Sequence, residues 1–197
     1  SIGGAVPDDA KGELIRYECS DRIATITLDR PAKLNALDDG MVMRLAELLH
    51  RFDTDAEADV AVLVGEGRAF CAGADVQQRQ LRSQAELKKL GGPQGWGAHS
   101  ADLFTRAINW KPVITAPHGF AVGLGLAMVL ESDVIVAEAG TKFQVAEVPR
   151  GLAGSRHWAL LAYRGHRSFA TEVTLTGRFF TAEEAQAAGV VDRVVPA

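Results

Sequence analysis

Two glycine-rich turns hold the residues of this sequence that could do chemistry. Residues 65–75 follow the strand-like run 60–64, and residues 119–125 follow the strand-like run 112–116. A turn of this kind that leads into a helix leaves backbone N–H groups free at the positive end of the helix dipole. Taken alone, either turn is more typical of an ordinary strand-to-helix connection. Together they can direct two N–H groups at one oxygen, which is an oxyanion hole suited to a thioester that forms an enolate.

Three motifs in a fixed order extend this interpretation. They are Asn35-Ala36-Leu37 after Arg30-Pro31, the Ala-Gly-Ala-Asp of residues 72–75, and the glycine-rich residues 119–125, which are followed by Asp133. In this order they resemble the crotonase family, also called the enoyl-CoA hydratase/isomerase superfamily. The resemblance runs from about Ile23 to Val195, and several motifs in order are more specific than any one of them.

The resemblance implies a site that is built mainly from backbone groups. Its oxyanion hole would consist of the N–H groups of Ala72 and Leu124, placed around the thioester carbonyl. The family usually has glycine where Leu124 stands, so this side chain is expected to narrow the acyl pocket; a leucine that simply starts a core helix fits the position as well. The residues implied to hold the nucleotide end of coenzyme A are Lys33, Leu34, Ala36, Ala72, Gly73, Ala74 and Asp75. For Lys33, a solvated surface amine is an equally good interpretation.

The carboxylates distinguish between the reactions of this family. Its hydratases use two glutamates to activate one water, and the first would stand where this sequence has Ala127. Glu131 lies one helical turn later, about 6 Å farther along the axis, and is a poor substitute. The second glutamate matches Glu147. By its residue type alone Glu147 would be a solvated or salt-bridged loop carboxylate, whereas the resemblance implies that it is the acid and base of the site.

These residues favour double-bond isomerisation of an enoyl-CoA, with Glu147 moving a proton from the alpha to the gamma carbon of the thioester. The alternatives are an enoyl-CoA hydratase with atypical catalytic residues, and an acyl-CoA-binding protein without catalytic activity. A thioester hydrolase or decarboxylase on the same scaffold also stays open, because this scaffold supports many reactions. No permanently bound cofactor is implied, and coenzyme A enters only as part of the substrate.

Other residue types give weaker signals. His118 precedes the second turn and fits a structural role better than contact with substrate. Cys71 adjoins the first turn, but no histidine stands at a position that would activate it. The histidines and cysteines show no metal-ligand spacing, and residues 123–128 do not fit the dinucleotide fingerprint. Three residues near a predicted covering loop, Trp96, His99 and Asp102, are candidates for a specialised site but are equally common on surfaces.

The elements that would position these residues alternate along the chain, which predicts an α/β fold. Strands are expected at 14–18, 23–28, 60–64, 112–116, 134–137 and 190–195, and helices at 38–52, 77–90, 102–110, 124–131, 167–175 and 182–188, with a loop at 91–97. The resemblance implies a crotonase-like spiral of repeated ββα units, with residues 1–197 as a single domain. Family members usually continue into C-terminal helices that pack between subunits, and because this chain ends at Ala197 we expect those trimerisation helices to be missing.

Composition limits the partners. A 197-residue chain with 47% hydrophobic residues is sufficient for one core, and a net charge of −4 without a basic run gives no footprint for nucleic acid or an acidic membrane. Its apolar runs are shorter than the roughly 20 residues of a membrane-spanning helix. Cys19 and Cys71 are expected to be reduced thiols. We therefore expect a cytoplasmic protein that binds an acyl-CoA, and the resemblance implies a homotrimer or a dimer of trimers.

Overall fold

The computed structural model describes residues 14–79, 83, 85 and 110–197. Among these residues, the larger sheet has six strands in the order β1-β2-β3-β4-β6-β9. They are β1 (Ile15–Ser20), β2 (Ile23–Leu28), β3 (Val60–Gly65), β4 (Val113–Thr115), β6 (Val134–Glu138) and β9 (Arg193–Val195). Only the pairing of β1 with β2 is antiparallel in this sheet. Asp21 and Arg22 form the turn between them with positive φ angles of 49° and 66°. Two-residue hairpin turns favour such angles because they match the right-handed twist of the flanking strands.

A smaller sheet crosses the ends of the large one. Its strands are β5 (Phe120–Val122), β7 (Lys142–Gln144) and β8 (Phe180–Thr181), in that order. Two isolated parallel bridges extend it, Cys71 with Ala121 and Leu37 with Ala74. Each strand of the large sheet from β2 to β6 is thus followed by a bridge or a strand in the second layer and then by a helical segment, which is the repeating strand-strand-helix unit that the sequence analysis predicted.

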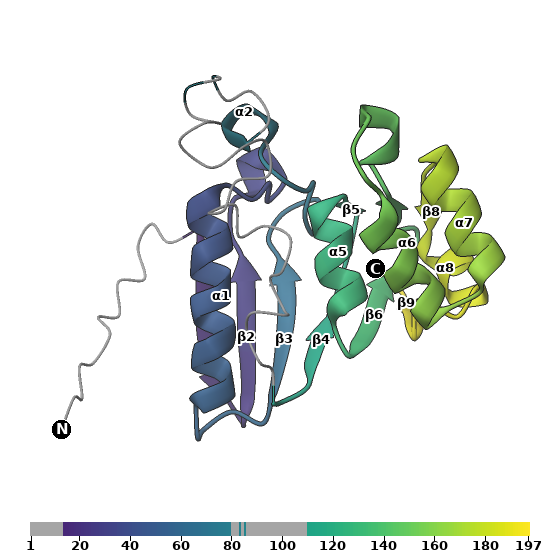
Figure 1. Cartoon of the computed structure of the whole chain (residues 1–197). Coiled ribbons are helices and arrows are strands. Elements are labelled where there is room, and N and C mark those ends of the chain that lie inside the picture. Colours follow the sequence, from purple (N-terminus) through teal and green to yellow (C-terminus); the bar gives the residue numbers. More distant parts are fainter. Residues whose placement is uncertain (1–13, 80–82, 84, 86–109) are drawn as a thin grey trace.

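The helices lie on both sides of this arrangement. The described helical segments are η1 (Pro31–Lys33), α1 (Asp39–Thr54), α2 (Val76–Arg79), α5 (Leu124–Glu131), η2 (Val148–Arg150), α6 (Ser155–Arg164), α7 (Arg167–Thr176) and α8 (Ala182–Ala187). Figure 1 shows α1 along β2 at one end of the sheet and α6, α7 and α8 grouped beyond β6 at the other. Asp38 begins α1 by accepting a hydrogen bond from the Met41 N–H (2.8 Å), and Thr181 with Glu184 forms a capping box at the start of α8.

Several predicted boundaries differ from the structure. The closing strand begins at Arg193 instead of residue 190, because the N–H groups of Val190 and Val191 donate to the Ala185 carbonyl at the end of α8. The strands β5 and β7 were not predicted, since each has only three residues. The ten-residue helix α6 was also not predicted. The predicted loop 91–97, most of the predicted helices 77–90 and 102–110, and the candidates Trp96, His99 and Asp102 lie outside the described residues.

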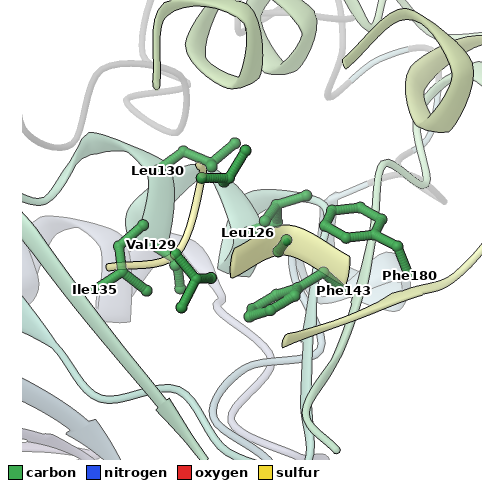
Figure 2. A pocket seen from close by; sticks show the side chains of 9 residues that line it. Leu126, Val129, Leu130, Ile135, Phe143 and Phe180 are labelled. Carbon is green, nitrogen blue, oxygen red and sulfur yellow. The ribbon is translucent and has the colours of Figure 1, made fainter. Parts of the chain in front are cut away.

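Helix α5 runs through the core and is buried along most of its length. Its residues Gly125 to Leu130 are all buried, which explains why its sequence is apolar on every face. Figure 2 shows Leu126, Val129 and Leu130 of this helix lining a small pocket together with Phe143 and Phe180. The side chains that line this small pocket are all apolar, so they belong to the core that holds α5 in place.

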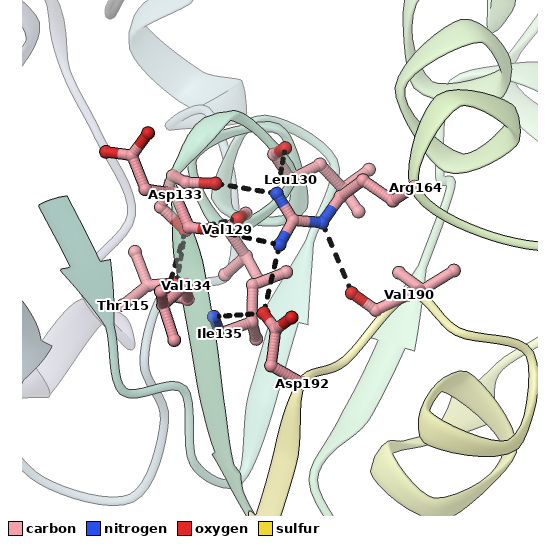
Figure 3. A network of polar contacts seen from close by, with 10 residues as sticks. Thr115, Val129, Leu130, Asp133, Val134, Ile135, Arg164, Val190 and Asp192 are labelled. Carbon is pink, nitrogen blue, oxygen red and sulfur yellow. Dashed lines mark hydrogen bonds and ion pairs between the residues drawn. The ribbon is translucent and has the colours of Figure 1, made fainter. Parts of the chain in front are cut away.

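The C-terminal end of α5 is fixed by Arg164. Its guanidinium donates to the Ser132 carbonyl (2.6 Å), to the Val190 carbonyl (3.2 Å) and to the Asp192 carboxylate (3.1 Å) (Figure 3). The Asp192 carboxylate also accepts from the Ile135 N–H (2.8 Å). A cation at the C-terminal end of a helix satisfies carbonyl groups that have no partner within the helix. This network therefore joins α5, α6 and the segment that leads into β9.

Candidate functional site

The turn between β5 and α5 is the centre of the candidate site. Gly123 precedes the helix with φ 53° and ψ −118° and is buried. Its N–H donates to the Gln144 carbonyl of β7 (3.0 Å), and its carbonyl accepts from the Ala127 N–H (2.9 Å). None of the described residues accepts a hydrogen bond from the Leu124 N–H. The helix therefore presents a free amide at its positive end.

The first glycine turn lies directly against the second. Cys71 pairs with Ala121, and its carbonyl accepts from the Val122 N–H (3.0 Å). Gly73 has a φ of +99°, and a Cβ at this position would lie 2.7 Å from the Val122 oxygen and 3.6 Å from the Leu124 nitrogen. No side chain fits there, so glycine is what allows the two backbones to approach. The structure thus brings together the two turns that the sequence analysis paired.

The Ala72 amide is already engaged. Its N–H donates to the Leu34 carbonyl at 2.9 Å, whereas the sequence analysis expected this N–H to be available to a thioester. The two predicted donors therefore differ: the Leu124 N–H has no acceptor among the described residues and the Ala72 N–H has one. The reason is the conformation of residues 34 and 35, both of which have positive φ angles (50° and 55°) and turn the Leu34 carbonyl toward the Ala72 loop.

Asn35 holds these loops together. It is 0% exposed, and its side-chain N–H₂ group donates to the carbonyls of Glu66 (2.9 Å), Ala69 (2.8 Å) and Phe70 (3.1 Å). Its side-chain oxygen accepts from the Arg30 N–H (2.8 Å). A buried amide satisfied on both sides fixes its neighbours more firmly than an apolar residue of the same size. Asn35 therefore ties the segment after β2 to the segment after β3, which leads into the first glycine turn.

The residues that the resemblance implies for coenzyme A binding lie in the loops that Asn35 connects. Lys33 is exposed at the end of η1, and Leu34, Ala36 and Ala74 are partly buried. The Asp75 carboxylate is 8% exposed and accepts from the Arg30 guanidinium (2.9 Å) and from the Gln77 N–H (3.1 Å). The side chain of Asp75 is thus used within the protein, and its neighbours present mainly backbone groups.

Glu147 reaches the same turn from the next repeat of the fold. It directly precedes η2, its side chain is 20% exposed, and a Cβ on Gly123 would lie 3.0 Å from its Oε1 atom. Its Oε2 atom is buried without a hydrogen-bond partner among the described residues. The carboxylate therefore lies beside the residue that precedes the free Leu124 amide, with one oxygen available.

Ala127 stands where the resemblance implies the first glutamate of the family's hydratases, and it carries no carboxylate. Ala127 is 3% exposed within α5. Glu131, one turn farther along, forms an ion pair with Arg156 and is nearly buried. The Glu131 carboxylate is thus used in an ion pair within the protein.

His157 lies at the site although the sequence analysis did not identify it. It is 5% exposed on α6, its Nε2 atom lies 2.9 Å from the Gly123 oxygen, and the same atom lies 3.7 Å from Glu147 Oε1. The sequence offers no local signal for this role, because a single histidine near the start of an amphipathic helix is usually structural. Only the packing of α6 against α5 brings it to Gly123.

The weaker candidates have structural roles. A ring nitrogen of His118 makes a hydrogen bond with the Gly67 carbonyl (2.8 Å). Burial raises the pKa of the Cys71 thiol to about 12, and this thiol donates to the Asn35 carbonyl (3.1 Å). Cys71 is thus an inert buried residue of the turn and not a nucleophile. The exposed Cys19 and the buried Cys71 are both free thiols.

Two absences hold for the part of the chain that the structure describes. Within it, no three histidine, cysteine or acidic residues are grouped so that they could hold a metal ion. None of its helices is long and apolar enough to cross a membrane.

The role of Asn35 can be tested with two substitutions. Asn35→Asp places a carboxylate against three carbonyl oxygens, so we expect it to lower the free energy of unfolding by about 3–5 kcal/mol near neutral pH. Asn35→Gly keeps the positive φ and should cost less, about 1–3 kcal/mol. The three carbonyl oxygens disfavour the charged form of the new acid, so its pKa in the folded protein should be raised and the loss in Asn35→Asp should be smaller at about pH 5 than at about pH 8. Denaturant unfolding at the two pH values measures these free energies. An equal loss of unfolding free energy in Asn35→Asp at both pH values would contradict the account.

Comparison with known proteins agrees with the geometry. A family model described as "Enoyl-CoA hydratase/isomerase" matches residues 18–197. The 2,3-dehydroadipyl-CoA hydratase of Escherichia coli (strain K12) is 34% identical over 176 residues, which cover 89% of this chain and 66% of that protein. The (E)-benzylidenesuccinyl-CoA hydratase of Thauera aromatica is 33% identical over 186 residues, which cover 92% and 69%.

Solved structures show the same fold. An enoyl-CoA hydratase from Mycobacterium smegmatis superimposes with a TM-score of 0.82 at 31% identity, covering 93% of this chain and 70% of that one. The chain spans about two thirds of the length of the curated relatives it matches. The predicted fold class is confirmed, and the chain belongs to the enoyl-CoA hydratase/isomerase family, the crotonase superfamily.

Proposed function

We propose that this protein is an enzyme that moves the double bond of an enoyl-CoA. The observation that carries the proposal is the position of Glu147: its carboxylate lies against Gly123, beside the unpartnered Leu124 N–H, and Ala127 leaves no second carboxylate in the place where hydratases of the family have one. One base beside one oxyanion donor is what proton transfer next to a thioester requires.

In this reaction the Glu147 carboxylate takes a proton from the alpha carbon of a 3-enoyl-CoA. The electron pair of the broken C–H bond moves into the conjugated system, and the thioester oxygen becomes negatively charged. The Leu124 N–H donates a hydrogen bond to that oxygen. Protonated Glu147 then returns the proton to the gamma carbon, which gives the 2-enoyl-CoA and restores the carboxylate.

Ala72 supplies the second donor in this proposal, but with a condition. Because its N–H donates to the Leu34 carbonyl (2.9 Å), the thioester oxygen must either share this N–H or displace the Leu34 carbonyl. Three-centre hydrogen bonds of this kind are common in proteins. The Leu124 N–H needs no such rearrangement and is therefore the primary donor.

The nucleotide end of coenzyme A would lie along the loops on either side of Asn35. The residues that we propose for it are Lys33, Leu34, Ala36, Ala72, Gly73, Ala74 and Asp75. Asp75 would contribute backbone groups, because its carboxylate is bound by Arg30. The other proposals that rest on the family resemblance are a single domain, assembly as a homotrimer or a dimer of trimers, and a cytoplasmic location.

A hydratase is the second candidate, because the relatives named above are hydratases. Hydration needs a water that is activated and oriented between two carboxylates in this family, and here only Glu147 occupies one of the two positions. A hydratase built on this site would therefore need another group to orient the water.

Glu147→Gln tests the leading proposal. It keeps the size of the side chain and removes the base, so isomerisation of a 3-enoyl-CoA should fall by about 10²- to 10⁴-fold. Glu57→Gln, at an exposed position between α1 and β3, is the matched control and should keep the activity of the unchanged protein. The rate of 2-enoyl-CoA formation measures the effect. Undiminished turnover by Glu147→Gln would remove this residue from the mechanism.

Ala127→Glu tests the hydratase alternative. If the site lacks only the first carboxylate, this substitution should raise hydration of a 2-enoyl-CoA by about 10-fold or more. Ala127→Gln has the same bulk without the acid and should show no gain. The loss of absorbance of the conjugated thioester follows the reaction. No gain in the glutamate variant, with the fold intact by circular dichroism, would count against a latent hydratase.

A further inference from the structure

We infer that His157 is a positioning residue that sets both the base and the oxyanion donor of this site; the inference rests on the proposed function. Three observations carry it: the Nε2 atom lies 2.9 Å from the Gly123 oxygen, the same atom lies 3.7 Å from Glu147 Oε1, and the imidazole is buried.

The contact with Gly123 defines the state of the ring. A carbonyl oxygen only accepts hydrogen bonds, so His157 Nε2 carries the hydrogen and donates it. The Nδ1 atom is buried and has no partner among the described residues. The Nε2–H group of the imidazole thus points at the Gly123 carbonyl, in the turn between β5 and α5. At 3.7 Å, Glu147 Oε1 is beyond hydrogen-bond distance but faces the positive edge of the same N–H.

The Gly123 carbonyl and the Leu124 N–H belong to one peptide unit. In a planar trans peptide these two groups point in opposite directions. A donor fixed on the carbonyl therefore fixes the direction of the N–H, and hydrogen bonds in series polarise one another. His157 thus anchors and polarises the Leu124 N–H from the side away from the thioester oxygen.

The segments that carry His157 and Glu147 are held in a fixed relation. The Leu152 N–H donates to the Glu147 carbonyl (2.9 Å), and the Trp158 N–H donates to the Gly154 carbonyl (3.0 Å) at the start of α6. A Cβ on Gly154 would lie 2.6 Å from a methyl group of Val148. The start of α6 is therefore packed directly on η2, so the histidine and the glutamate lie on two segments that are in direct contact.

Exchange of the alpha protons of butyryl-CoA in heavy water tests the inference. This exchange reports enolate formation without requiring a double bond to move. His157→Leu removes the N–H and should slow exchange by about 10- to 100-fold, while the dissociation constant for butyryl-CoA changes by less than about 3-fold, because a positioning role requires no contact between the ring and the ligand. His157→Gln keeps a side-chain N–H at similar reach and should recover most of the rate.

The Glu147→Gln background separates the two contacts. If His157 acts partly through Glu147, His157→Leu should slow exchange less in this background than in the unchanged protein. Wild-type exchange rates in His157→Leu, or an equal loss in His157→Gln and His157→Leu with unchanged melting temperatures, would overturn the inference. No exchange by the unchanged protein would instead overturn the proposed function, and the positioning role with it.

Discussion

The peptide unit between Gly123 and Leu124 is the constraint on which the site depends. Its carbonyl accepts from the Ala127 N–H and from His157, and its N–H is left without an acceptor among the described residues. Gly123 is also tied to β7 through Gln144. Because a peptide is rigid, holding one of its ends aims the other. The direction of the free amide is therefore set by the surrounding packing and not by the turn alone.

The fold supplies that packing by repetition. Successive units each place a strand in the large sheet and a bridge or a strand in the small one, so loops that are far apart in sequence meet at one edge. Gly73 comes from the unit of β3, Gly123 from the unit of β4, and Glu147 from the unit of β6. Asn35 ties the first of these loops to the segment after β2, and Arg164 holds the far end of α5.

The sequence made part of this predictable. Glycines mark turns that need unusual backbone angles, so both turns were found, and family resemblance pointed to Glu147 and to the gap at Ala127. The engagement of Ala72 was not predictable, because its acceptor lies on Leu34, in a different loop, and depends on two positive φ angles. His157 was missed for a related reason: its role arises from the packing of α6 against α5, and the amphipathic pattern of a helix does not show which of its residues will meet a site. The use of the Asp75 side chain by Arg30 likewise depends on a contact across 45 positions.

The vibrational frequency of a bound thioester carbonyl tests the central claim most directly. An acyl-CoA labelled with a heavy isotope at this carbonyl can be followed by infrared difference spectroscopy when it binds. If the Leu124 amide is aimed at the carbonyl oxygen in a site that excludes water, its stretching frequency should fall below the value in water, because a preorganised donor polarises the bond more strongly than solvent does. A frequency equal to or above the value in water would contradict the account.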